Sequence, residues 1–151
     1  MICIIDYGSG NIAALMNVFK QSKIPHFLSN DPAELKNADR FLLPGVGAFD
    51  PTMEQLTRSG IVEALSEQVL GQGKKVIGIC VGMHLLAEAS DEGDLAGLGW
   101  IKGRVRKIDT STLNGPPLLP HMGWNAVSVR PGASLFDGVD QAHGFYFLHS
   151  Y

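Results

Sequence analysis

Short apolar segments alternate with helical segments through the first 90 residues of the sequence. Four apolar segments are rich in branched side chains and end at glycine, proline or polar turns, as strands do: residues 2–6, 26–29, 40–44 and 75–79. Helical spacing of apolar residues, or an Asp-Pro N-cap signal, follows each of them: residues 12–19, 31 onward, 51–58 with 61–70, and 80–90. This alternation predicts an α/β fold with an open, mostly parallel sheet and helices on both faces.

The character of the sequence changes after residue 97. Segments 97–108, 124–130 and 144–150 read as strands joined by turns that contain glycine or proline, with no strong helix between them. We expect them to form a mixed or antiparallel extension of the same sheet. Because no linker or repeat separates the parts, we expect one domain over residues 1–151.

Charge and composition exclude several classes of partner. The net charge of −3 and the isoelectric point near 5.9 give no electrostatic reason to expect nucleic acid or an anionic membrane surface. No apolar segment has membrane-spanning length and no secretory leader is evident, so we expect a cytoplasmic protein. The five histidines and two cysteines show no metal-ligand spacing, so we expect no metal and no cofactor.

The stretch Gly78-Ile-Cys-Val-Gly82 places Cys80 where the fourth expected strand gives way to a helix. Gly-x-Ser-x-Gly at such a turn is a nucleophile elbow, and cysteine takes the place of serine here. An elbow would expose the sulfur, direct the positive end of the helix toward it, and leave the N–H of Val81 free to bind an oxyanion. A buried cysteine at a strand end, with glycines that only permit close packing, explains the same pattern.

A second glycine loop, Pro44-Gly-Val-Gly47, follows the third expected strand. Glycines on both sides of Val46 permit an unusual backbone conformation that could turn a peptide N–H toward a ligand. Acyl transfer needs donors at the developing oxyanion, and two loops at one sheet edge can supply one each. The alternative is a tight turn that only links a strand to a helix.

Five motifs together resemble a known family: DYGSGN at 6–11, LPGVGAF at 43–49, GICVGMHLL at 78–86, PHMGWN at 120–125 and FYFLHSY at 145–151. Their order and spacing resemble the class I glutamine amidotransferases, and in particular the members that serve imidazole glycerol phosphate synthases in histidine biosynthesis. The resemblance covers essentially the whole chain. It implies a flavodoxin-like sheet with Cys80 as the nucleophile.

The activity that this resemblance implies is a glutaminase reaction. Cys80 would attack the side-chain amide of L-glutamine, form a glutamyl thioester and release ammonia. A (β/α)₈-barrel cyclase subunit, as heterodimer partner, would use the ammonia to form imidazole glycerol phosphate. The residues implied are Val46, Gly47 and Val81 at the oxyanion site, Gly45, His84, His149, Ser150 and Tyr151 at glutamine, and His121, Met122, Trp124 and Asn125 at the partner interface.

The sequence departs from the family at two points. His84 stands where the family usually has glutamine, four residues after the nucleophile, at a position that contacts the substrate. The base and its carboxylate belong to a His-x-Glu element beyond the HSY segment, and no His-x-Glu occurs in residues 1–151. We therefore expect an incomplete chain that is inactive alone, unless His84, about one helical turn beyond Cys80, acts as the base.

Three other functions remain open at this point. A paralogous subunit could supply ammonia to a different synthase, for instance for amidation of surface sugars. Another cysteine-elbow hydrolase could share the sheet, although PHMGWN would have no role in it. A non-catalytic module that docks on a barrel partner is the alternative outside the enzymes.

Overall fold

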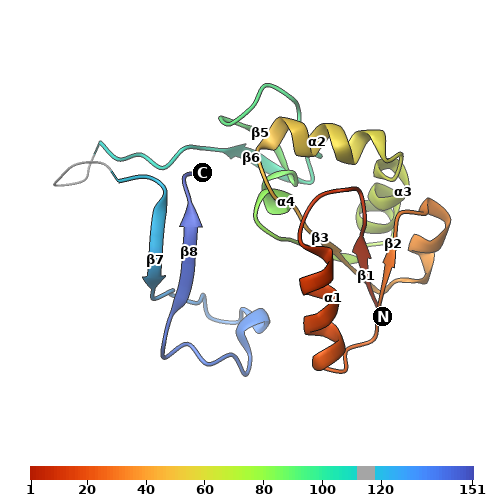
Figure 1. Cartoon of the computed structure of the whole chain (residues 1–151), viewed down its shortest axis with the longest axis horizontal. Coiled ribbons are helices and arrows are strands. Elements are labelled where there is room, and N and C mark those ends of the chain that lie inside the picture. The colour runs from red at the N-terminus through yellow and green to blue at the C-terminus, as the bar shows by residue number, and fades with distance from the viewer. Residues whose placement is uncertain (112–117) are drawn as a thin grey trace. The chain divides into compact units, whose positions relative to one another are not determined.

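A four-stranded parallel sheet with strand order β2-β1-β3-β4 organises the first part of the chain (Figure 1). Its strands lie at the four places predicted: β1 Ile2–Ile5, β2 His26–Ser29, β3 Arg40–Leu43 and β4 Lys75–Gly78. Each strand is four residues long and is followed by a crossover to the next. The predicted α/β class with a mostly parallel central sheet is confirmed.

Side chains on the central strands alternate between two buried faces. Cys3 and Ile5 on β1, with Phe41 and Leu43 on β3, contribute to one core cluster. Ile4 on β1 is also fully buried but does not belong to that cluster, as expected for residues that alternate across a strand. A central strand that is apolar on both faces is typical of a parallel sheet with a layer on each side.

Helices supply these layers: α1 Ile12–Gln21, α2 Phe49–Arg58 and α3 Val62–Ser66, with a 3₁₀ helix η1 at Pro32–Asn37 and a π-helical turn η2 at Glu67–Gly71. Helices α2 and α3 bury Phe49, Met53, Leu56 and Leu65 in the core cluster. The half-buried residues of α1 are the four apolar ones whose spacing predicted it: Ile12, Leu15, Met16 and Phe19. The predicted N-cap is present, because the Asp31 carboxylate accepts the N–H of Ala33 at 2.8 Å.

The helix expected over residues 80–90 is wrong beyond its first turn. Helix α4 covers only Val81–His84, and residues Ala87–Ser90 form strand β5, which pairs in parallel with β6 at Ile101–Val105. The returning segment 97–101 donates its N–H groups to the carbonyls of Leu85, Leu86, Ala87 and Glu88. Those carbonyls would otherwise bind N–H groups of a continuing helix, so tertiary pairing replaces it.

Strands β7 His121–Asn125 and β8 Phe145–His149 form an antiparallel ribbon in the last part of the chain, with a 3₁₀ turn η3 at Ser134–Phe136. The strand expected at 124–130 is therefore displaced toward the N-terminus. The pairing ends at Asn125 and Phe145, because the chain reverses at Gly144, whose φ of +68° suits glycine. A Cβ atom at Gly144 would lie 2.5 Å from the carbonyl oxygen of Asn125, so this reversal needs a glycine.

The expected extension of the central sheet is also not observed. Among the residues that the structure describes, the strands after β4 form two sheets of their own, β5-β6 and β7-β8. The first pairing is parallel and the second antiparallel. Strand β4 is consequently an edge of the central sheet in the described part of the chain.

The computed structural model describes residues 1–111 and 118–151. Two units are distinguished within it, Met1–Arg106 and Lys107–Tyr151, and each is treated by itself. The expectation of one domain stays a prediction. No helix in the described residues is long and apolar enough to cross a membrane.

Candidate active site

Cys80 occupies the sharp turn between β4 and α4 and is exposed to solvent. Its φ of 54° and ψ of −126° form a conformation that L-residues rarely adopt, which is the strained geometry of a nucleophile elbow. A Cβ atom at Gly78 would lie 2.4 Å from the Cα atom of Met83, and one at Gly82 would lie 2.2 Å from the carbonyl oxygen of Leu43. Gly78 is therefore required for the turn itself and Gly82 for its close approach to the end of β3. Because Cys80 is exposed, the alternative of a buried strand-end cysteine is wrong.

Hydrogen bonds within the elbow leave one donor unused. The N–H groups of Gly82 and Met83 donate to the carbonyls of Ile79 and Cys80, at 3.0 and 2.8 Å. The N–H of Val81 makes no hydrogen bond to any residue that the structure describes. A free N–H directly after Cys80 fits the expected role of Val81 as an oxyanion donor, and that role stays a prediction.

The loop Pro44–Gly47 at the end of β3 lies against the elbow. A Cβ atom at Gly45 would lie 2.5 Å from the N atom of Gly82 and 2.7 Å from the Cγ1 atom of Val81, so only a glycine allows this approach. Gly47 has a φ of +104°, which also favours glycine. Two loops from adjacent strands thus meet at the carboxyl edge of the sheet, where open α/β sheets bind their ligands.

A third loop, which follows β1, holds the Pro44–Gly47 loop from its other side. The Oγ atom of Ser9 accepts the N–H of Val46 at 3.0 Å and donates to the carbonyl of the same residue at 3.2 Å. The hydroxyl of Tyr7 donates to the carbonyl oxygen of Pro44. The predicted oxyanion donor of Val46 is therefore engaged by Ser9 in this conformation.

Tyr7 keeps its proton over a wide range of pH. Burial raises the pKa of Tyr7 to about 12, although a hydrogen bond with Ser9 lowers it in part. The phenol is consequently a stable donor to Pro44. Sequence reasoning assigned no role to Tyr7 or Ser9, although their position directly after the first predicted strand places them at the same sheet edge.

Two carboxylates fix the start of α2, directly after the Pro44–Gly47 loop. Glu92 accepts the N–H of Phe49 at 3.2 Å, and Asp50 accepts the N–H groups of Asp94 and Leu95 at 2.9 and 3.1 Å. The start of α2 thus donates an N–H to the segment after β5 and accepts N–H groups from the same segment. The sequence held no signal for them, because the partners are more than 40 residues apart.

His84 lies one turn beyond Cys80, and its N–H points to the carbonyl oxygen of Cys80 at 3.4 Å. The residue is half-buried, and its Nδ1 atom is enclosed by the protein. Its predicted contact with glutamine, and its possible role as base, stay predictions.

The remaining predicted residues belong to the second unit. Met122 and Trp124 on β7 pair across the ribbon with Leu148 and Tyr146, and all four side chains are more than half exposed. The rings of Trp124 and Tyr146 meet edge to face with centroids 5.7 Å apart. Together these four residues form an exposed apolar face, which we call the ribbon face.

Polar residues of the ribbon include the other predicted positions. His121 pairs with His149 across the strands with ring centroids 5.5 Å apart, and the Asn125 amide lies 2.9 Å from the Nε2 atom of His121. The Nδ1 atom of His149 bonds to the carbonyl oxygen of Tyr151 at 2.8 Å. Ser150 accepts the N–H of Ile108 through its carbonyl oxygen. These two hydrogen bonds are the contacts that the structure gives for residues 150 and 151, which follow the end of β8 at His149.

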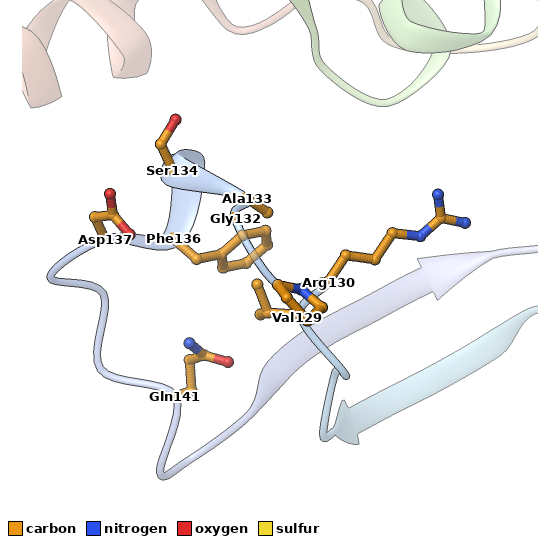
Figure 2. A pocket seen from close by; sticks show the side chains of 9 residues that line it. Val129, Arg130, Gly132, Ala133, Ser134, Phe136, Asp137 and Gln141 are labelled. Carbon is orange, nitrogen blue, oxygen red and sulfur yellow. The ribbon is translucent and has the colours of Figure 1, made fainter.

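A pocket of about 320 Å³ lies in the second unit and contains none of the predicted site residues. Residues 129–141 line it, with the Phe136 ring and Val129 at its centre (Figure 2). Figure 2 shows the Arg130 guanidinium directed away from Asp137, so the charged groups do not converge on a ligand. In the described residues, no group of three or more histidine, cysteine or acidic side chains could hold a metal ion.

Comparisons with known proteins agree with this geometry. Residues 3–151 match the family Glutamine amidotransferase class-I. "Imidazole glycerol phosphate synthase subunit HisH" of Bdellovibrio bacteriovorus is 46% identical over all of this chain and 74% of its own length. The proteins of the same name from Leptospira borgpetersenii and Sulfurimonas denitrificans are 40% and 43% identical, over 74% and 72% of their lengths.

A crystal structure of a glutamine amidotransferase superposes on 71% of this chain and 57% of its own, with a TM-score of 0.57 and 15% sequence identity. At that identity the likeness concerns the fold alone. The family match and the relatives carry the assignment further. The chain belongs to the class I glutamine amidotransferases and, within them, to the HisH subunits of imidazole glycerol phosphate synthase.

Proposed function

We propose that this chain is the glutaminase subunit of an imidazole glycerol phosphate synthase, with Cys80 as its nucleophile. The observation that carries the proposal is the backbone of Cys80, a strained and exposed elbow at the carboxyl edge of the sheet. Such strain persists in proteins where a function requires it. A cysteine that served only packing would have no reason to adopt a positive φ.

The reaction begins when the Cys80 sulfur attacks the carboxamide carbon of L-glutamine. The carbonyl becomes an oxyanion, and the N–H of Val81, which has no other partner in the described residues, lies next to the nucleophile to bind it. Collapse of this intermediate breaks the C–N bond and releases ammonia, which leaves a γ-glutamyl thioester. Water then hydrolyses the thioester to glutamate and restores the thiol.

Substrate positioning is proposed from the family motifs, and each unit is considered by itself. Gly45 packs closely against the elbow, Gly47 leaves open space beside its backbone, and His84 follows Cys80 by one turn. The segment His149-Ser150-Tyr151, which begins at the last residue of β8, is assigned to the α-amino and α-carboxyl groups of glutamine. These assignments rest on the family motifs.

The ammonia acceptor is a separate (β/α)₈-barrel cyclase subunit, with which this chain forms a heterodimer. The ribbon face, with Trp124 at 68% exposure, offers the apolar anchor that protein interfaces favour. His121 and Asn125 lie beside it on β7. A free nucleophilic thiol is kept reduced in the cytoplasm, which is where we place the protein.

A diazoketone analogue of glutamine tests the assignment of the nucleophile. It is added to the complex of this protein with the cyclase subunit, and the alkylated residue is identified by peptide mass spectrometry. We expect a single label on Cys80, blocked by excess glutamine, with loss of ammonia release in the same proportion. Cys3 serves as an internal control because it is fully buried.

Two results would contradict the proposal. Ammonia release that survives in Cys80→Ala would assign the chemistry to another residue. A chain that binds the cyclase subunit but is never labelled, and releases no ammonia, would be a docking module rather than an enzyme.

A further inference from the structure

A pocket of about 310 Å³ lies in the first unit, between α2 and the segment that follows β5, and we call it the α2 pocket. Four of its residues form one stripe of α2 and two belong to the opposite segment: Met53, Glu54, Thr57, Arg58, Leu95 and Ala96. None of them is a predicted site residue. The volume is at the lower end for pockets that hold small molecules, so it suits a ligand with a single apolar group.

The two walls of the α2 pocket are fixed to each other beside it. Asp50, one turn before Met53 on α2, accepts the N–H groups of Asp94 and Leu95 at 2.9 and 3.1 Å. A Cβ atom at Gly93 would lie 2.0 Å from the Oδ1 atom of Asp50, so only a glycine allows this approach of the segment to the helix. The walls are therefore in place before a ligand binds, and little ordering opposes binding.

The inner surface of the pocket is apolar. Met53 is only 8% exposed and belongs to the core cluster, and the partly exposed Leu95 lies opposite it with Ala96. The hydroxyl of Thr57 donates to the carbonyl oxygen of Met53 at 2.9 Å, so it is satisfied within the helix. An apolar group can thus enter without leaving a buried polar atom unpaired.

Two opposite charges border this apolar surface. Glu54 and Arg58 are both exposed and lie four residues apart, in the order that favours an ion pair on a helix. Neither of them makes an ion pair with the other, or with any residue in the described part of the chain. The carboxylate can therefore bind a cationic group of a ligand, and the guanidinium can bind an anionic one.

From this arrangement we infer that the α2 pocket binds a free α-amino acid with an apolar side chain. The side chain fills the space between Met53 and Leu95, the ammonium group binds Glu54, and the carboxylate binds Arg58. A fatty acid or an internal peptide segment fits less well, because neither carries both charges next to one apolar group. The inference goes beyond the proposed function, since the pocket shares no residue with the elbow at Cys80.

The test is an NMR titration of the isotope-labelled protein with L-leucine. We expect shifts of the amide signals of Thr57, Leu95 and Ala96, with a Kd in the millimolar range. Isocaproate, which lacks the ammonium group, and isoamylamine, which lacks the carboxylate, should each bind about 2- to 5-fold more weakly, the factor of an exposed ion pair. Glycine has no apolar side chain and should not shift these signals.

Charge variants separate the two polar contacts. Glu54→Gln should lose the preference for L-leucine over isocaproate and keep the preference over isoamylamine. Arg58→Gln should show the reverse pattern. The matched control is Glu63→Gln, because Glu63 is exposed on α3 and does not line the pocket, and this variant should bind all three ligands like the parent.

Leu95→Ser tests the apolar wall. It should weaken L-leucine binding by about 5-fold because apolar contact area is lost, whereas the backbone N–H that binds Asp50 remains. An affinity equal to that of the parent would refute the inference.

Three results with the parent protein would also overturn it, and these need no variant to fold. They are the absence of any shift, isocaproate or isoamylamine binding as tightly as L-leucine, and shifts confined to Cys80–Gly82. The last result would place the amino acid at the proposed glutamine site, which would leave the proposed function intact. Failure of the diazoketone to label Cys80 would instead contradict the proposed function alone.

Discussion

Replacing Cys80 by glycine should stabilise the protein, although the same change abolishes catalysis. Cys80 has a φ of 54° and a ψ of −126°, where the Cβ atom of an L-residue meets its own backbone. Strain of this kind costs about 1–3 kcal/mol. Glycine has no Cβ atom and is not strained there, but it loses about 0.5–1 kcal/mol more conformational entropy on folding than alanine does.

The balance of these two effects predicts a difference of about 1 kcal/mol in favour of Cys80→Gly over Cys80→Ala. Alanine is the matched control, because it removes the thiol and keeps the Cβ atom. Since the thiol is exposed, little burial is lost in either variant. For a protein of this size the difference corresponds to about 2–4 °C in melting temperature.

Chemical denaturation and differential scanning calorimetry of the two variants measure this difference. Glycine variants at ordinary helix and strand positions are less stable than alanine variants, so the expected order is the reverse of the usual one. A Cys80→Ala protein as stable as Cys80→Gly, or more stable, would show that the elbow is not strained. The elbow argument for Cys80 as nucleophile would then lose its main support.

Three further changes have defined outcomes. Trp124→Ala should weaken cyclase binding by about 10-fold or more, as measured by calorimetric titration, because interface aromatics are typical anchors. Its melting temperature should stay within about 2 °C of the parent, because the ring is exposed. Unaltered affinity with a large loss of stability would place the ring in the core instead. Gly82→Ala should destabilise by about 3 kcal/mol, since its Cβ atom would lie 2.2 Å from the Leu43 carbonyl oxygen in a site that cannot expand freely; urea unfolding with an unchanged midpoint would contradict this contact. Between pH 10 and pH 12 the parent should lose stability as pH rises. The reason is that the pKa of Tyr7 is raised from 10.0 to about 12 in the folded protein, so the unfolded chain releases the phenol proton first. Tyr7→Phe should remove the part of this loss that belongs to Tyr7, and identical stability–pH profiles of the two proteins would refute the prediction.

The central sheet is the part of the fold that local sequence specified well. Strands β1 to β4 are short segments with apolar side chains that end at turn residues, and each of them occurs where it was predicted. Helix α1 follows the spacing of Ile12, Leu15, Met16 and Phe19, and η1 begins at the Asp31 cap. These signals act within one element, so residues distant in sequence are not needed to interpret them.

The errors lie where distant segments compete with local preference. Residues 85–88 have apolar spacing that suits a helix, but segment 97–101 binds their carbonyls and converts them to an irregular turn and strand β5. In the ribbon, the register of β7 is set by its pairing with β8, and the last pair, Asn125 with Phe145, lies next to Gly144. The sequence of residues 85–88 does not reveal that segment 97–101 will bind their carbonyls, and the sequence of β7 does not reveal its pairing with β8.

The sequence by itself determined the elbow at Cys80, because the pattern Gly78-x-Cys80-x-Gly82 lies within one strand-to-helix turn. It also supported the family, through motifs that span the whole chain. Only the tertiary structure decided which backbone N–H groups near Cys80 are already hydrogen-bonded. Parallel crossovers bring the loops after β1, β3 and β4 to one edge, where the hydroxyl of Ser9 accepts the N–H of Val46, 37 positions away in the chain. A hydrogen bond between such distant residues follows from strand order and loop packing, and no local pattern contains it.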